Sequence, residues 1–350
     1  MEPCSRGGIM GLFDKLLKPN ITKLESHGDI EALANLVESD DRRDLRITAI
    51  EALARIGGPK TTDRLVRTLG SDDADVAGSA GKAIAGFGLA AGSALVGALD
   101  GPGGEAAKRL LLNLGDEAVE VLRGACSDQD EAIRLQALGT LVDLDAGLDN
   151  DEVRESLFRA LLAALGDRSA ECRVFAATRL EALGNPKAGR ALASQLKDGD
   201  DTVRTACRHA LLAIGEPAVP YLLDALADRN MNSRRLAAEL LGEVCGGKVT
   251  VDSQRVALLG LIDRASDGNA EIAAAVHRAL EAIPSDAVIT EQLEWLADPE
   301  RSDHEEIEEF LAQMLEHGGF SPEAIKRIAE NMSRAEADRV GASYSLADGS

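Results

Sequence analysis

The chain has 350 residues and a formal net charge of −22, and although 45% of its residues are hydrophobic, only 3% are aromatic. So acidic a chain is repelled by nucleic-acid backbones and anionic membranes, and it offers few aromatic side chains on which bases could stack. The composition therefore argues against nucleic acid and favours a basic protein or peptide as partner, with a surface that is merely solvated as the alternative. The excess of Arg over Lys fits a bacterial or archaeal protein.

The N-terminal segment, residues 1–20, is expected to hold a leader and a short capping helix. Met1–Gly8 is typical of a leader, and translation could begin at Met10. Residues 11–18 are amphipathic and are expected to cover the open end of the first helix pair. Contact of 11–18 with a membrane is the alternative, and it is disfavoured because the segment is short and carries little positive charge.

From residue 21 to residue 318, apolar residues recur at a spacing that predicts paired helices. In Leu45–Ile56 and Val203–Ile214 the apolar residues span about three helical turns and form one stripe on one helix face. The stripe returns every ~31 residues, with some intervals near ~38, which is typical of a helical solenoid. We expect about nine helix pairs: 28–39 with 44–56, 60–69 with 75–87, 89–99 with 104–114, 116–127 with 131–144, 151–165 with 170–183, 186–197 with 201–214, 216–227 with 232–245, 251–266 with 270–282, and 287–297 with 303–317.

A C-terminal capping helix is predicted within residues 319–340. Ser321 is its expected N-cap, and Pro322 stands at the first helical position, where its missing N–H is not needed. Residues 341–350 are expected to form a disordered tail.

The loops between paired helices are rich in Asp, as in Asp128-Gln-Asp130 and Asp198-Gly-Asp200. An Asp at this place accepts the unpaired N–H groups of the next helix. Calcium binding is the alternative to capping, and it is disfavoured because the loops lack the spacing of an EF-hand. Residues 70–104 are rich in glycine and are predicted to be the softest part of the array. Gly101–Gly104 lacks the pattern of a P-loop, so a flexible turn is favoured over a phosphate cradle.

No catalytic residue, metal site or cofactor is predicted. The cysteines are scattered singly, which favours a reducing cytoplasm over a disulfide framework. Two of them, Cys172 and Cys245, occupy stripe positions where Cys acts as a small buried apolar residue. The sequence contains no apolar run near the ~20 residues that span a bilayer.

Two segments carry a resemblance to a known family. Asp200–Gly215 and Asp128–Leu138 resemble the HEAT-like repeats first associated with phycobilisome lyases and found in archaeal and bacterial scaffold proteins. Met10–Asn20 is similar to the start of archaeal members. The resemblance covers about residues 20–318, and it implies an all-α fold, a right-handed α-α superhelix.

The resemblance also implies a ladder of Arg side chains between repeats. In such families an Arg follows the first stripe residue of each second helix and pairs with an Asp of an adjacent repeat. Ala77, Ala273 and Glu308 depart from this pattern, so the ladder is expected to fail there. The matching residues are Arg46, Arg134, Arg173, Arg204 and Arg235.

Candidate partner-binding residues are those that point away from the stripe, towards what the resemblance implies is a concave wall. In the first half they are apolar: Ile47, Ile50, Leu135 and Leu138. In the second half they are charged or polar, with a net acidic character: Arg208, His209, Glu239, Glu243, His277, Arg278 and Glu281.

These observations predict a cytoplasmic, non-enzymatic scaffold that binds a protein or peptide along this wall. Apolar anchors in the first half would supply affinity, and charges in the second half would orient the partner. The resemblance implies one alternative, a lyase or chaperone that acts on a tetrapyrrole-bearing protein. The sequence leaves the oligomeric state open.

Overall fold

The computed structural model describes residues 20–296, 304–317, 326 and 328–330. Its contacts divide the chain into two compact units, residues 1–160 (unit 1) and 161–350 (unit 2). The described residues form α-helices and short 3-10 turns and contain no strand. The prediction of an all-α fold made of helix pairs is confirmed.

Several predicted features lie outside the described residues. They are the capping helix at 11–18, the start at Met10, the Ser321-Pro322 helix start and the tail 341–350. Of the predicted helix within 319–340, the structure describes only residues 326 and 328–330, which are helical.

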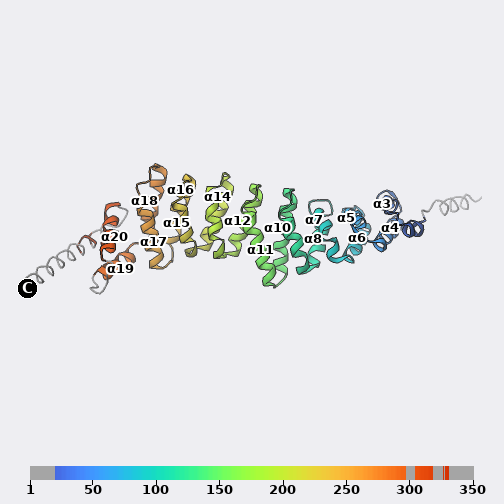
Figure 1. Ribbon diagram of the computed structural model, residues 1–350, viewed down its shortest axis with the longest axis horizontal. Coiled ribbons are helices and arrows are strands. Elements are labelled where there is room, and N and C mark those ends of the chain that lie inside the picture. Colours follow the sequence, from blue (N-terminus) through green and yellow to red (C-terminus); the bar gives the residue numbers. More distant parts are fainter. Residues whose placement is uncertain (1–19, 297–303, 318–325, 327, 331–350) are drawn as a thin grey trace, which may run out of the picture. The chain divides into compact units, whose positions relative to one another are not determined.

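Unit 1 consists of helix pairs arranged in two layers (Figure 1). The first helices α3, α5, α7 and α9 pack in sequence in one layer, and the second helices α4, α6, α8 and α10 pack in sequence in the other. Each pair contacts its neighbours, so the core grows from pair to pair. The bounds are α2 Ile21–His27, α3 Ile30–Ser39, α4 Arg43–Ile56, α5 Pro59–Thr68, α6 Ala74–Ala85, η1 Gly88–Ala91, α7 Gly92–Gly97, α8 Gly104–Asn113, η2 Gly115–Ala118, α9 Val119–Ala125 and α10 Glu131–Gly147.

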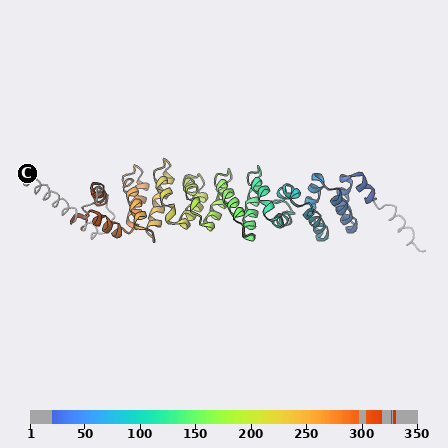
Figure 2. The same ribbon diagram turned by 60° about the horizontal axis from the view of Figure 1, so that its bottom comes forward.

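Unit 2 repeats this arrangement, and its successive pairs lie side by side in both views (Figures 1 and 2). The second helices α12, α14, α16 and α18 form one layer, and α13, α15, α17 and α19 form the other. The helix α11 (Asp151–Ala164) runs across the division between the units. The other bounds are α12 Ala170–Leu183, η3 Pro186–Ala188, α13 Gly189–Ser194, η4 Gln195–Lys197, α14 Asp201–Ile214, η5 Glu216–Ala218, α15 Val219–Leu226, α16 Met231–Cys245, α17 Val251–Ile262, α18 Ala270–Ala282, α19 Asp286–Leu296 and α20 His304–His317.

The Asp-rich loops cap the second helices, as predicted. The Asp200 carboxylate accepts the Thr202 N–H at 2.8 Å, and the Asp198 carboxylate accepts the Asp200 N–H at 2.8 Å. The loop before α10 has the same geometry, since Asp128 accepts the Asp130 N–H at 2.8 Å and Asp130 caps the helix. Each loop therefore uses one carboxylate to shape the turn and a second to satisfy the first helical turn.

The stripes form the core, and small side chains set how closely the helices pack. In α14 the residues Val203, Cys207, Ala210 and Leu211 are fully buried. In α16, Gly242 leaves no room for a side chain, because a Cβ there would lie 2.8 Å from the Cα of Ala279 in α18. Because the chain has few aromatic residues and many small ones, the second helices can pack in close contact.

One helix was not predicted. The helix α2 begins after Asn20, whose side chain accepts the Lys23 N–H at 3.0 Å, and ends at Gly28 with a left-handed φ of 64°. It packs against α3 and α4. Its Glu25 receives two hydrogen bonds from Arg55 of α4, at 2.6 and 2.9 Å. The sequence suggested that residues 11–18 contact the first helix pair. In the structure, α2 makes such a contact.

The glycine-rich segment contains a tightly packed turn before α8. Gly103 and Gly104 are both buried. A Cβ on Gly104 would lie 2.2 Å from the Leu99 carbonyl oxygen, and a Cβ on Gly103 would lie 2.7 Å from the Leu69 Cβ. Close approach of backbone to backbone therefore requires glycine here, whereas the exposed Gly78 within α6 has nothing within 4 Å of its Cβ position. The softness of this region stays a prediction.

Replacing these two kinds of glycine with alanine should change the free energy of unfolding in opposite directions. Gly104→Ala should lower the free energy of unfolding by about 1–3 kcal/mol, because the backbone must shift to admit the methyl group. Gly78→Ala, the matched control, should raise it by about 0.5–1 kcal/mol by restricting the unfolded chain and favouring helix. Urea denaturation of both variants measures the difference, and equal effects would contradict the close packing at Gly104.

Candidate functional site

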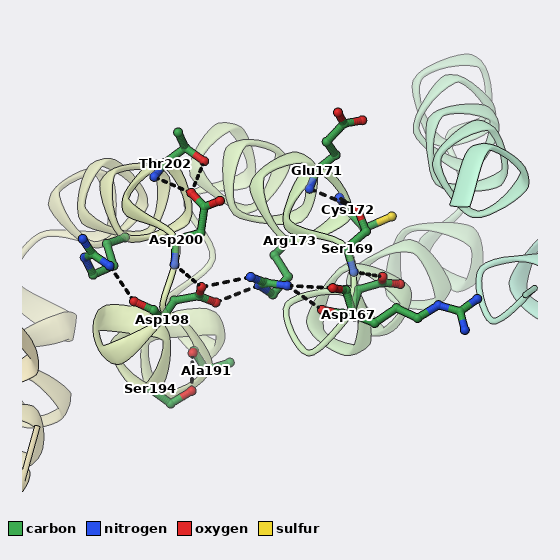
Figure 3. Close-up of polar contacts among 12 residues, drawn as sticks. Asp167, Ser169, Glu171, Cys172, Arg173, Ala191, Ser194, Asp198, Asp200 and Thr202 are labelled. Atoms are coloured by element: carbon green, nitrogen blue, oxygen red, sulfur yellow. Dashed lines mark hydrogen bonds and ion pairs between the residues drawn. The ribbon is translucent and has the colours of Figure 1, made fainter. Parts of the chain in front are cut away.

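A ladder of Arg side chains joins successive repeats of unit 2, and Arg173 of α12 shows its geometry (Figure 3). Its Nη1 donates to the backbone carbonyl of Asp167, in the loop before its own helix, at 2.8 Å. Its Nε and Nη2 donate to the two carboxylate oxygens of Asp198, in the corresponding loop of the next repeat, at 2.7 and 2.9 Å. One guanidinium therefore joins two neighbouring loops, as the ladder prediction requires.

The ladder position in α16 is Arg234, and the prediction of Arg235 was wrong. Arg234 donates to the Asp228 carbonyl at 3.1 Å and to the Asp267 carboxylate at 2.8 and 3.4 Å. Arg235 instead contacts Glu239 of its own helix at 2.9 Å. The cause is the register. The sequence places the start of the α16 stripe at Arg234, which makes Arg235 the next residue, whereas in the structure the stripe begins at Ser233, which is buried although polar.

The other ladder residues make different contacts. Arg46 donates to the Val37 carbonyl at 2.7 Å and to the Ser71 hydroxyl at 3.2 Å, because the next loop offers a serine and not an aspartate. Arg204 donates to the Asp198 carbonyl at 2.6 Å and to Asp201 of its own helix at 2.8 Å.

Arg134 holds the loop before its own helix, as Arg173 does. It is buried, and it donates to the carbonyl groups of Asp128 and Gln129 at 2.9 and 3.2 Å. Arg134, Arg173, Arg204 and Arg234 thus all donate to a backbone carbonyl in the loop before their own helix.

The paired ladder carboxylates are buried and held ionised. The side chain of Asp198 is 8% exposed, as is that of Asp267. Burial acts to raise the pKa of Asp198, but the hydrogen bonds from Arg173 and the Asp200 N–H outweigh it, and the net pKa lies below its ordinary value. For Asp267 the hydrogen bond from the Asn269 N–H is the largest cause of its lowered pKa, and Arg234 adds to it.

The apolar half of the predicted binding wall is corrected by the structure. Ile50 and Leu138 are fully buried, so they belong to the core and not to a binding surface. The buried arc of a second helix is wide because that helix packs on a partner of its own pair and on neighbouring second helices; α4, for example, contacts α3, α2 and α6. Ile47 and Leu135 are half-buried.

The charged half of the wall comes together in unit 2. Arg208 of α14, Glu239 and Glu243 of α16, and Arg278 of α18 line one open groove with a cavity volume of about 330 Å³. Arg208 pairs with Glu243, and Arg278 lies 3.7 Å from Glu239. Four predicted residues from three helices are thus neighbours, and their charges alternate rather than being net acidic.

The floor of this groove consists of small residues. Gly242 of α16 and Ala275, Ala279 and Ala282 of α18 complete its lining. Gly242, Ala275 and Ala279 are buried and Ala282 is exposed, so most of the surface that the groove offers belongs to the charged side chains around the floor. The remaining predicted residues, His209, His277 and Glu281, are exposed on α14 and α18 but do not line the groove.

The thiols of two buried cysteines are unsuited to nucleophilic chemistry. Burial raises the pKa of Cys207 to about 12 and that of Cys245 to about 11, so both are protonated near neutral pH. Among the residues that the structure describes, no group of His, Cys, Asp and Glu is arranged to hold a metal ion. A search of the same residues finds no helix with the length and apolar character needed to cross a membrane.

The register of the ladder can be tested with two adjacent residues. Arg234→Gln should lower the free energy of unfolding by about 3 kcal/mol, because it leaves the buried Asp267 carboxylate unpaired. Arg235→Gln, the matched control, should cost less than about 1 kcal/mol, since its contact with Glu239 is a partly exposed pair within one helix. Chemical denaturation of both variants distinguishes them, and a larger loss for Arg235→Gln would restore the original register.

The ladder should also shape the acid sensitivity of unit 2. The folded pKa of Asp198 lies below its ordinary value of 3.8, so its contribution is fully present above pH 3.8 and is lost as the pH falls through the folded value. Asp198→Asn should therefore lower stability at neutral pH but flatten its decline between about pH 5 and pH 2. Melting temperatures across that range provide the measurement, with Asp63→Asn, at an exposed position of α5, as the control; an unchanged slope would show that Asp198 contributes nothing.

Two regions of the chain match a known family. Residues 30–115 and 158–242 match the family described as HEAT repeats. The comparison with curated protein sequences finds no match.

Solved structures with a similar fold include an engineered protein, at 19% identity and a TM-score of 0.36, over 88% of this chain and 98% of that one. Importin beta has 13% identity and a TM-score of 0.44, over 83% of this chain and 41% of its own. The CpcE–CpcF complex of phycocyanin lyase from Nostoc has 24% identity and a TM-score of 0.30, over 45% of this chain and 96% of that one.

Both matched regions coincide with helix pairs of the two-layer arrangement, residues 30–115 in unit 1 and most of residues 158–242 in unit 2. The chain therefore contains HEAT repeats, as its resemblance to this family predicted.

Proposed function

We propose that the protein is a binding scaffold, and that unit 2 binds a segment of a partner protein along the groove formed by α14, α16 and α18. The observation that carries this proposal is the grouping of Arg208, Glu239, Glu243 and Arg278 over a floor of Gly and Ala. Solenoid repeats commonly use such extended second-helix surfaces for binding.

The ion pairs that frame the groove are suited to exchange with a partner. Arg278 is 68% exposed and lies 3.7 Å from Glu239, and Glu243, the partner of Arg208, is 43% exposed. Pairs this exposed contribute only about 0–1 kcal/mol each. A partner's charged groups could therefore replace them at little cost.

The partner that fits best carries Lys or Arg beside small or apolar residues. Glu239 and Glu243 lie one helical turn apart on α16, so both can face one bound segment. The net charge of −22 adds a long-range attraction for a basic segment. The apolar anchors once expected in the first half are no longer part of the proposal, since Ile50 and Leu138 are buried.

A charge-reversal pair tests the groove directly. Fluorescent 15-residue peptides that present Lys on one helical face should bind the wild-type protein, and Glu239→Lys with Glu243→Lys should weaken that binding by about tenfold or more. The matched control is Asp224→Lys with Asp252→Lys, which changes the net charge equally at exposed sites on α15 and α17. Fluorescence anisotropy measures both.

If both double variants weaken binding equally, the effect is one of overall charge and the groove assignment fails. The tetrapyrrole alternative is tested with the same protein, because a specific bilin complex would change the visible absorption spectrum on mixing. A saturable change abolished by groove variants would favour that alternative over a peptide scaffold.

A further inference from the structure

The ladder of unit 1 is incomplete where α4 meets the next repeat. Ser71 occupies the place that Asp198 has in unit 2: it lies two residues before the N-cap Asp73, and its hydroxyl accepts the Asp73 N–H at 3.3 Å. Asp198 accepts the Asp200 N–H in the same way at 2.8 Å. Arg46 therefore meets a hydroxyl where Arg173 meets a carboxylate.

The guanidinium of Arg46 is positioned but not neutralised. Its Nε donates to the Val37 carbonyl at 2.7 Å and its Nη2 to Ser71 at 3.2 Å, both in partly buried surroundings. Within the part of the chain that the structure describes, no carboxylate pairs with it. A carbonyl and a hydroxyl carry no charge. The Arg46 guanidinium therefore keeps N–H donors that an anion could bind, and its positive charge is not neutralised.

An open cavity of about 720 Å³ adjoins this guanidinium. Arg46, Arg43 and Arg67 all line it, and its volume lies within the ~300–1,000 Å³ usual for ligand sites. Arg67 is exposed and makes no hydrogen bond or ion pair with any described residue. Two guanidinium groups with unused donors thus face one cavity.

Of the three acidic residues that line the cavity, Asp73 is the one held firmly by hydrogen bonds. Asp73 accepts a hydrogen bond from Arg43 at 2.7 Å and caps the first turn of α6. The hydrogen bond from Arg43 is the largest cause of its lowered pKa. Glu38 also lines the cavity, and it lies 3.8 Å from Arg64, which is not part of the lining. Asp72 is exposed at the rim.

We propose that this cavity binds a carboxylate, presented by an acidic side chain of a peptide, which occupies at Arg46 and Arg67 the place that Asp198 occupies at Arg173. A carboxylate is the anion that the chain itself uses at the equivalent position of unit 2. A singly charged carboxylate is also repelled less by Asp72 and Glu38 than a doubly charged phosphate would be.

The decisive variant installs the missing ladder group. Ser71→Asp should form the pair seen at Asp198, so it should raise the melting temperature while filling the anion position from within. Binding of an acetylated, amidated tetraglutamate peptide, measured by calorimetry at low salt, should weaken by about tenfold or more. Ser26→Asp, an equal charge change at an exposed position of α2, is the matched control and should leave binding unchanged.

Arg67→Gln supplies a second test that does not depend on the ladder, because this exposed side chain makes no contact that folding requires. It should also weaken the peptide about tenfold with an unchanged melting temperature. Glutarate, as a free dicarboxylate, shows whether a small acid suffices; saturable binding of either probe that depends on both residues supports the proposal.

Three results would overturn the proposal: neither carboxylate binds saturably, inorganic phosphate binds more tightly than both, or Ser71→Asp binds the peptide as the wild type does. A lower melting temperature for Ser71→Asp would contradict the equivalence of Ser71 and Asp198 on which it rests.

Discussion

The contact on which each regular repeat junction depends is a single guanidinium shared by two loops. Arg173 and Arg234 each hold a backbone carbonyl of their own loop and the carboxylate of the next one. That carboxylate also shapes the turn that starts the following second helix. The same interaction thus sets where a helix begins and how its repeat lies against the preceding one. Because each repeat contacts only its neighbours, these contacts at each junction determine how the repeats stack within a unit.

Close packing of small side chains is the second constraint, and it explains why the groove in unit 2 has a floor of Gly and Ala framed by charged residues. Gly242 approaches Ala279 so closely that a methyl group would not fit. In unit 1, by contrast, the apolar side chains of Ile50 and Leu138, predicted to lie on the wall, are buried in the core. In unit 2, long charged side chains reach past the contact and line the groove instead.

The helix pairs, the caps and the family could be predicted from the sequence because each depends on residues close together in the chain. The errors arose where packing between repeats decides. A stripe of apolar residues does not reveal that Ser233 is buried, so the register of α16 was misplaced by one residue and Arg235 was chosen over Arg234. Nor does helical periodicity show how wide the buried arc is when a helix has neighbours on several sides. The helix α2 was missed because seven residues give too short a periodic signal.

Burial separates the charges that hold the fold from those available to a partner, although both sets consist of the same residue types. The ladder carboxylates Asp198 and Asp267 are 8% exposed, each contacted by two nitrogens of one guanidinium. Removing one partner there leaves a buried charge, which is costly. Glu243 is 43% exposed, and the contact between Arg278 and Glu239 is long, so water or a ligand can replace either partner. A solenoid that uses Arg and acidic residues for both purposes can therefore change its partners by altering exposed pairs while leaving its ladder intact.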